Sequence, residues 1–309
     1  MNILIALGGN AILRESEKGT FEEQQSNIAN TARHITKIIK RGHNVVITHG
    51  NGPQVGDILL RYENAKAQLP IMPLHVCGGE SQGLIGYMIE QAMTNELERA
   101  GIRKDVVCVL TRVVVSKHDP HFRSPSKPIG PFYKKREADR LAKKFGWALI
   151  REGENYRRVV PSPMPLGILE LDTIRKLMAD GKVVICAGGG GIPVVKERGS
   201  LRGVDAVIDK DFASSLLARM LKVDLFIILT DVDHVFLDYR KKDQKKLLRV
   251  GVDECKAYLA ADRFEEGSMK PKIEAAIRFV ESTHKKAVIT ALENADRVIK
   301  GGSGTTIVP

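Results

Sequence analysis

Five glycine-rich turns are the first chemical signal in this sequence, and we expect each to follow a short apolar strand. Glycine tolerates positive φ angles and lets backbone amides approach a ligand closely, so such turns at the carboxyl ends of parallel strands can bind an anion. One turn of this kind is ordinary loop geometry, but several along one sheet favour a phosphate site. The turns are Gly8-Gly9-Asn10, Gly50-Asn51-Gly52-Pro53, Gly78-Gly79, 188–191 and 301–304.

Two lysines stand where an amine could meet such an anion. Lys210 lies between Asp209 and Asp211, directly ahead of an apolar helical stretch whose N-terminus would add positive potential. Lys270 also lies at an expected helix start, where the helix dipole disfavours a cation, so a structural role explains it poorly. The alternatives are a charged surface N-cap at 209–211 and an exposed first-turn lysine at 270.

Other candidate sites are weaker, and the common nucleotide-binding signatures are missing. The sequence has no G-x-x-x-x-G-K-[ST], no G-x-G-x-x-G at these glycines, and no H-R-D or D-F-G, which argues against P-loop, Rossmann and protein-kinase sites. Thr230 and Asp231 end an apolar run and could meet a ribose hydroxyl or a metal, or form an acidic turn. His118, Asp119 and His121 have a spacing that could suit a metal ion, but a third firm metal ligand is missing, so we expect a polar loop there.

The elements that would position these residues follow an alternating pattern. Short apolar, β-branched runs alternate with stretches of helical period, which predicts an α/β fold, a three-layer αβα sandwich around a mostly parallel sheet. The expected strands are 3–7, 44–48, 106–115, 183–187, 225–229 and 287–290. The expected helices are 22–40, 81–99, 170–179, 212–221 and 271–283, the second capped by Ser81 and the last entered through Ser268 and Pro271.

Length and composition describe a globular protein. The 309 residues suggest about two lobes with a core that needs no disulfides. The four scattered cysteines predict buried free thiols. No apolar run reaches the roughly 18 residues of a membrane span, and the first residues lack the pattern of a secretion signal, so we expect a cytoplasmic protein without membrane contact.

The net charge of +11 is concentrated in two segments. Residues 116–165 contain twelve Lys/Arg, five Asp/Glu and seven of the 13 prolines, which marks an inserted, protruding subdomain. Residues 240–249 contain six basic residues against one acidic residue and are typical of an exposed hairpin tip. A nucleic-acid-binding protein is the alternative, but aromatic residues are only 5% of the chain and few lie in these segments, so base stacking is poorly supported.

Eight motifs make the sequence similar to the carbamate kinases, a branch of the amino-acid kinase superfamily. They are ALGGNAIL (6–13), THGNGPQVG (48–56), SKPIGPFY (126–133), YRRVVPSPMP (156–165), AGGGGIPVV (187–195), VIDKDFASSLLA (207–218), ILTDVDHV (228–235) and GSMKPKIEAA (267–276). They run in order through nearly the whole chain. Other superfamily members carry a lysine two positions before the first glycine pair, where this sequence has Ala6. That difference fits the carbamate kinase branch rather than acetylglutamate, glutamate or aspartate kinases.

The resemblance implies reversible phosphoryl transfer, ATP + carbamate ⇌ ADP + carbamoyl phosphate, with Mg²⁺ accompanying the nucleotide and no protein metal ligands assigned. It implies a cytoplasmic homodimer of arginine metabolism. It also implies one amino-acid kinase fold over 1–309, with an acceptor-binding half at about 1–185 that contains the subdomain at about 116–165, and a nucleotide-binding half at about 186–309. The alternative is a UMP or amino-acid kinase of the same superfamily.

The resemblance also implies roles for individual residues. Lys210 and Lys270 would neutralise the transferring phosphoryl group and the leaving oxygen, Asp211 would hold the lysines in place, and Asn10 would be a further catalytic residue. Lys127 would reach from the subdomain toward the acceptor. The other substrate-binding residues would be Gly8, Gly9, Gly50, Asn51, Gly52, Gly189 and Asp209. The nucleotide-binding residues would be Thr230, Asp231, Val235, Tyr239 and Met269.

Overall fold

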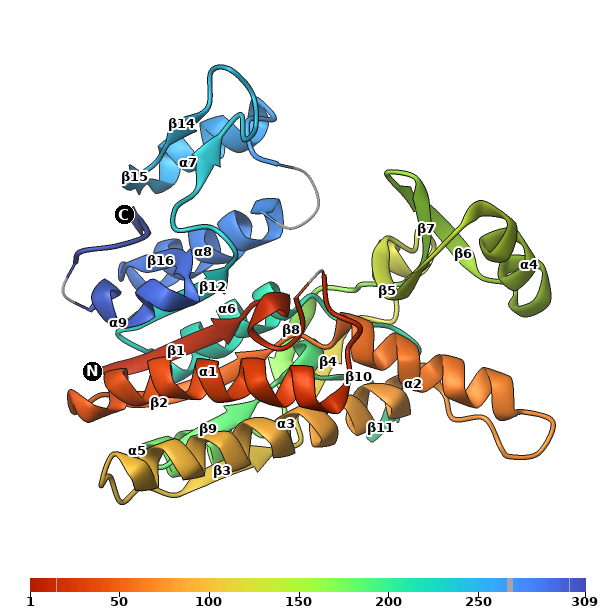
Figure 1. Ribbon diagram of the computed structural model, residues 1–309, viewed down its shortest axis with the longest axis horizontal. Coiled ribbons are helices and arrows are strands. Elements are labelled where there is room, and N and C mark those ends of the chain that lie inside the picture. The colour runs from red at the N-terminus through yellow and green to blue at the C-terminus, as the bar shows by residue number, and fades with distance from the viewer. Residues whose placement is uncertain (15, 266–268, 300) are drawn as a thin grey trace.

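A mostly parallel sheet of eight strands forms the centre of the protein (Figure 1). This computed structural model describes residues 1–14, 16–265, 269–299 and 301–309. All neighbouring strands are parallel except β16 and β17. In spatial order, the strands are β15 (Arg249–Gly251), β17 (Thr305–Val308), β16 (Ala287–Ala291), β12 (Leu225–Thr230), β1 (Asn2–Leu7), β2 (Asn44–His49), β9 (Val183–Cys186) and β3 (Val106–Val109).

Helices cover both faces of this sheet, because its strands are apolar on both sides. In β1, Leu4 and Ala6 belong to one core cluster, and Ile3, Ile5 and Leu7 to the other. The first cluster is covered by α5 (Leu171–Ala179), α6 (Lys210–Leu221), α7 (Val252–Ala260) and α8 (Met269–Thr283). The second is covered by α1 (Phe21–Lys40), α3 (Leu74–Arg99) and α9 (Ala295–Val298). The predicted three-layer αβα sandwich is therefore confirmed.

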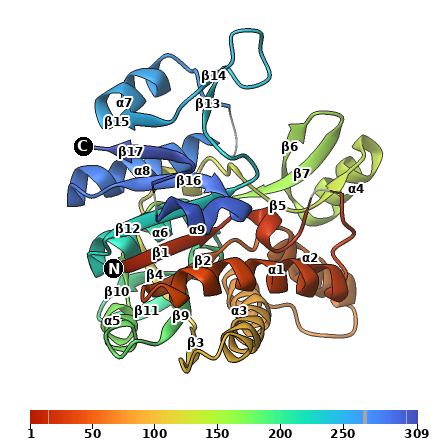
Figure 2. The same ribbon diagram turned by 60° about the vertical axis from the view of Figure 1, so that its left-hand side comes forward.

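Smaller units extend from this sandwich. A second sheet has the strand order β11 (Ser200–Gly203), β10 (Ile192–Glu197), β4 (Arg112–Val115) and β8 (Pro165–Ile168). A third sheet has the order β5 (Lys127–Tyr133), β7 (Asn155–Val160) and β6 (Ala148–Glu152), and packs with α4 (Lys135–Phe145). This third unit lies apart from the main sheet in both views (Figure 1, Figure 2). It is the protruding subdomain that charge and proline content predict.

The subdomain contacts the main body through α2 (Gly52–Ala65). A Cβ atom added to Gly56 of α2 would lie 2.0 Å from the Cα of Gly130 in β5. The two backbones therefore touch at a pair of glycines, and no larger residue at position 56 fits without movement. Gly130 has a φ of +72°, so it too has a conformation that favours glycine.

Three expectations about the elements were wrong. Residues 106–115 form two strands, β3 and β4, in different sheets. The glycines Gly78 and Gly79 lie inside α3, which begins at Leu74, so they end no strand and Ser81 does not cap the helix. The glycine turn at 301–304 precedes β17 instead of following a strand. Residue 300, just before it, is outside the described residues.

Other expectations about the chain agree with the structure. The basic segment 240–249 lies around an antiparallel pair, β13 (Phe236–Leu237) with β14 (Lys245–Lys246), and most of its side chains are exposed. The four cysteines are free, three of them buried and Cys108 partly buried. Within the described residues, no helix is long and apolar enough to cross a membrane. The expected entry of α8 through Ser268 falls outside the described residues.

Candidate active site

Three of the glycine turns meet at the carboxyl ends of β1, β2 and β9. Gly8 follows β1 and precedes the 3₁₀ helix η1 (Gly9–Ala11), and Asn51 precedes α2. The turn η3 (Gly188–Gly190) follows β9. A Cβ on Gly189 would lie 2.1 Å from Nδ2 of Asn51, and one on Gly8 would lie 2.6 Å from the carbonyl oxygen of Leu229 in β12. These glycines are required because the neighbouring turns and strands touch them.

The remaining glycines of the predicted site face open space. A Cβ on Gly9, Gly50 or Gly52 would have no other atom within 4 Å. Their backbones are therefore accessible to a ligand at the same edge of the sheet. The structure thus brings together the residues expected at the first two turns and at Gly189.

Lysines and aspartates gather at the N-terminus of α6. Asp209 caps the helix, and its Oδ1 accepts a hydrogen bond from the backbone N–H of Asp211 at 2.8 Å. Lys127, the first residue of β5, places its Nζ 2.5 Å from Oδ2 of Asp209. Lys210 places its Nζ 2.7 Å from Oδ1 of Asp211, and Lys272 of α8 lies 3.7 Å from Oδ2 of the same residue. Three ammonium groups and two carboxylates therefore surround the positive end of a helix, which suits an anion.

Lys270, which we expected in this cluster, points elsewhere. Its Nζ forms an ion pair with Asp262, at the end of α7, and Lys272 contacts Asp211 instead. Residues two apart on a helix lie about 200° apart around its axis, so these lysines extend from opposite sides of α8. Sequence analysis missed Lys272, although the motif GSMKPK contains both lysines. The missing information was which side of α8 packs against α6, and a lysine-rich motif at a helix start does not show that.

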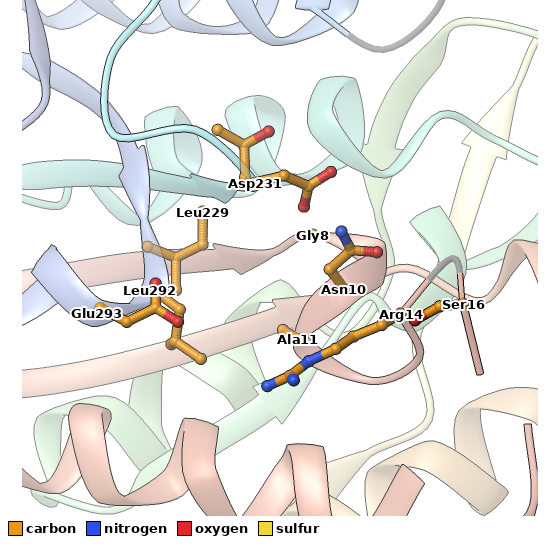
Figure 3. Close-up of a pocket in the computed structure, with 10 residues that line it drawn as sticks. Gly8, Asn10, Ala11, Arg14, Ser16, Leu229, Asp231, Leu292 and Glu293 are labelled. Carbon is orange, nitrogen blue, oxygen red and sulfur yellow. The ribbon is translucent and has the colours of Figure 1, made fainter. Parts of the chain in front are cut away.

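The cavity beside these turns has a volume of about 610 Å³ (Figure 3). Four of the predicted site residues line it, namely Gly8, Asn10, Thr230 and Asp231. The side chains of Asn10 and Asp231 extend toward one another across the cavity (Figure 3). Sequence analysis did not identify the other lining residues, which are Ala11, Arg14, Ser16, Leu229, Leu292 and Glu293. Leu292 and Glu293 belong to the 3₁₀ helix η4 (Leu292–Asn294), which follows β16 and which no sequence motif marks.

The other expected nucleotide-binding residues do not line this cavity. Val235 is fully buried, and its backbone N–H donates to Oγ1 of Thr305 at 2.8 Å. Met269 is 7% exposed and belongs to the core between α6, α8 and the sheet. The ring of Tyr239 packs 5.7 Å from that of Phe236 and under the guanidinium of Arg240.

Comparison with known proteins places this geometry in a family. The sequence profile described as the amino acid kinase family matches residues 1–291. The chain belongs to the amino acid kinase family. The carbamate kinase of Pyrococcus horikoshii is 47% identical over 310 residues, which cover 99% of each protein. The carbamate kinase of Trichomonas vaginalis is 45% identical over 313 residues, the full length of both.

Solved structures point to the same branch of the amino acid kinase family. The carbamate kinase of Giardia lamblia bound to AMP-PNP superimposes with a TM-score of 0.92 at 45% identity, covering 99% of this chain and 98% of that one. These relatives confirm the similarity to carbamate kinases that the motifs indicate. They do not favour a UMP kinase, another amino-acid kinase or a nucleic-acid-binding protein.

The lysines and aspartates at the N-terminus of α6 shift one another's pKa values. Burial raises the pKa of Asp209, but the ammonium groups of Lys127 and Lys210 and the backbone N–H of Asp211 together lower it more, to about 2. Burial lowers the pKa of Lys127, but the carboxylates of Asp209 and Asp211 together raise it more, so the net pKa is raised. For Lys210, burial lowers the pKa, Asp211 raises it and Lys272 lowers it, with a net decrease. Lys127 and Asp209 therefore stabilise each other's charged forms, whereas Lys210 gains from a further anion.

The histidines expected in a polar loop do form one. His121 lies within the short 3₁₀ helix η2 (Pro120–Phe122), and its Nδ1 lies 2.7 Å from Oδ1 of Asp119. The other oxygen of Asp119 accepts a hydrogen bond from the backbone N–H of Met164 at 2.9 Å. In the part of the chain that the structure describes, no group of three or more His, Cys, Asp or Glu side chains could hold a metal ion.

Proposed function

We propose that this chain is a carbamate kinase that catalyses ATP + carbamate ⇌ ADP + carbamoyl phosphate. The cluster of Lys127, Lys210 and Lys272 around two aspartates carries the proposal, because it lies at a helix N-terminus near the glycine turns. The high identity to carbamate kinases over the full chain supports it.

The proposed chemistry is electrostatic. Carbamate is already an anion, so its attack on the γ-phosphate needs no general base. The difficulty is to bring two anions together and to stabilise charge on the transferring phosphoryl group and the leaving oxygen. Lys210 and Lys272 would supply that stabilisation, and Asp211, which contacts both, would orient them. The backbones of Gly9, Gly50 and Gly52 would approach the reacting groups.

Mg²⁺ would enter with the nucleotide. It prefers oxygen ligands and commonly uses one or two carboxylates together with phosphates. Asp231 fits this requirement, because its carboxylate extends into the cavity toward Asn10 (Figure 3). When bound, Mg²⁺ neutralises phosphate charge; the lysines and backbone amides of this chain bind and orient the anions.

The proposal divides the chain by function. Residues at about 1–185 would bind the acceptor and residues at about 186–309 the nucleotide, with the subdomain at about 116–165 as a lid. The position of Lys127 favours this role for the subdomain, because Lys127 belongs to the subdomain strand β5 and contacts Asp209 of the main body. A closed lid would exclude water from carbamate and carbamoyl phosphate.

We also propose a homodimer, in keeping with a cytoplasmic enzyme of arginine metabolism. On α3, the apolar side chains of Val76, Leu84 and Tyr87 are exposed. Their spacing places them on one side of the helix. The segment before α3 adds the exposed Leu69, Ile71 and Met72. We call these six residues the α3 apolar face; its pairing with the same face of a second copy would bury both.

A coupled assay tests the proposed activity. Purified protein with ADP, Mg²⁺ and carbamoyl phosphate should form ATP, and acetyl phosphate should replace carbamoyl phosphate poorly. In the reverse direction, UMP, glutamate and acetylglutamate should not accept phosphate from ATP. Failure to form ATP, or a preference for one of those acceptors, would refute the proposal.

A further inference from the structure

Two polar side chains on α3 are buried without any helix-capping role. Ser81 is 0% exposed and Gln82 is 2% exposed, in a helix that begins seven residues before Ser81. Burying a hydroxyl or an amide is costly unless each group finds a hydrogen-bond partner. Their partners therefore indicate what these residues do.

Ser81 fixes the side chain of Asn51. Its Oγ donates to the carbonyl of Gly78 at 2.7 Å and accepts a hydrogen bond from Nδ2 of Asn51 at 2.7 Å. The same Asn51 amide also lies against Gly189, where an added Cβ would be 2.1 Å from Nδ2. The amide is held between α3 and the turn η3. Asn51 thereby links the turn after β2 to the turn after β9.

Gln82 holds the beginning of that second turn through Thr111, which lies between β3 and β4. Oε1 of Gln82 accepts a hydrogen bond from the backbone N–H of Thr111 at 2.9 Å, and Nε2 of Gln82 donates to the carbonyl of Thr111 at 3.1 Å. Oγ1 of Thr111 in turn accepts from the backbone N–H of Ala187 at 2.9 Å. Ala187 has a φ of +49°, an unfavourable conformation for a residue with a side chain, so this residue needs such support.

His49 fills the space between the same two turns. It is 1% exposed, and its Nδ1 lies 2.9 Å from the carbonyl oxygen of Gly50, so Nδ1 carries the proton. A Cβ on Gly188 would lie 2.3 Å from Nε2 of His49. The turns after β2 and β9 are therefore packed together with little free volume, and the hydrogen bonds from α3 set their alignment.

We propose that Ser81 and Gln82 are positioning residues for phosphoryl transfer, which align the Asn51 turn with η3 without touching the substrate. The inference rests on the proposed function, because phosphoryl transfer would place the reacting groups at these two turns. Amides stabilise a transition state only when they are fixed in advance, so a small loss of alignment lowers kcat. Binding of ADP, which depends on residues beyond β12, should be little affected.

The test is a double-mutant cycle between Ser81→Ala and Asn51→Ala, measured as ATP formation from ADP and carbamoyl phosphate. Ser81→Ala alone should lower kcat about tenfold, the effect of about one buried hydrogen bond, with an unchanged KM for ADP. In the Asn51→Ala background, the same change should have almost no further effect, because the partner is gone. Gln82→Met should lower kcat similarly and independently of Asn51.

Thr94→Ala is the matched control, because its hydroxyl also bonds to a carbonyl of α3, that of Glu90, but on the exposed surface. It should keep the wild-type kcat. The inference is overturned if Ser81→Ala keeps the wild-type kcat, or if it lowers kcat by the same factor with and without Asn51. An inactive wild-type protein would instead refute the proposed function. Equal thermal midpoints of the variants and the control exclude misfolding as the cause of a lower kcat.

Discussion

Lys272 and Lys270 provide a direct comparison at the scale of single residues. Lys272 is 8% exposed and contacts Asp211 beside Lys210, whereas Lys270 pairs with Asp262 near the surface. Removing an electrostatic donor from a transition state commonly costs about 10² or more in kcat. Lys272→Ala and Lys210→Ala should both lose that much, and Lys270→Ala should stay within about threefold of the wild type. Steady-state ATP formation measures all three, and a Lys270→Ala variant as impaired as Lys272→Ala would contradict the assignment.

The ion pair between Lys127 and Asp209 makes a prediction about pH. The pKa of Asp209 is about 2, below its ordinary value, so its pairing stabilises the fold above about pH 4 and the stabilisation is lost as pH falls toward 2. The raised pKa of Lys127 extends the stabilisation to alkaline pH. Lys127→Met should therefore be less stable than the wild type at pH 7, and the difference should shrink toward pH 3. Urea unfolding at both pH values measures this, and a difference independent of pH would contradict it.

Sequence alone identifies the chemistry of a side chain better than the direction in which that side chain points. Lys210 and Asp211 are neighbours at a helix start, so their contact could be anticipated from adjacency and the helix N-terminus. Lys272 could not be chosen over Lys270, because the two lysines lie on opposite sides of α8 and the sequence does not show which side packs against α6. The contact of Ser81 could not be predicted either, because its hydrogen-bond partner Asn51 is distant in the sequence.

At the scale of elements, the contact between α2 and β5 decides how the subdomain sits. A Cβ on Gly56 would lie 2.0 Å from backbone atoms of β5, so Gly56→Ala must push β5 away and move Lys127, its first residue. We expect a loss of about 1–3 kcal/mol in the free energy of unfolding and a several-fold higher KM for carbamoyl phosphate, with a smaller change for ADP. Thermal unfolding and steady-state kinetics measure these effects.

Gly251→Ala is the control, because Gly251 has a φ of −76° and no atom within 4 Å of an added Cβ, and it lies in β15, away from the subdomain and the α3 apolar face. As the N-cap of α7 it should lose at most about 1 kcal/mol of stability and keep both KM values. If Gly56→Ala raises the KM for ADP as much as that for carbamoyl phosphate, the subdomain does not act on the acceptor side alone.

Elements with a strong apolar pattern were predictable, and breaks without a signal were not. The strands β1, β2, β9, β12 and β16 read as short apolar runs, so their positions are correct within about one residue. The two short strands β15 and β17 at the edge of the main sheet were not predicted. The split of 106–115 into β3 and β4 falls at Leu110 and Thr111, where no glycine or proline marks it. The first two turns of α3 were missed because Gly78 and Gly79 look like a loop, although the helix continues through them.

At the scale of the whole molecule, the α3 apolar face predicts the oligomeric state. Leu84 and Tyr87 are 40% and 57% exposed, so a stable monomer would leave both in water. Burying them against a second copy would make the wild type a dimer of twice 34.1 kDa, and a charge at Leu84 would be buried twice in a two-fold interface. Leu84→Asp should therefore be a folded monomer in light scattering after gel filtration. Leu248 is an exposed leucine outside the α3 apolar face, at 62% exposure, and Leu248→Asp should remain a dimer. A wild-type monomer would remove the proposed interface, and a dimeric Leu84→Asp would place it elsewhere.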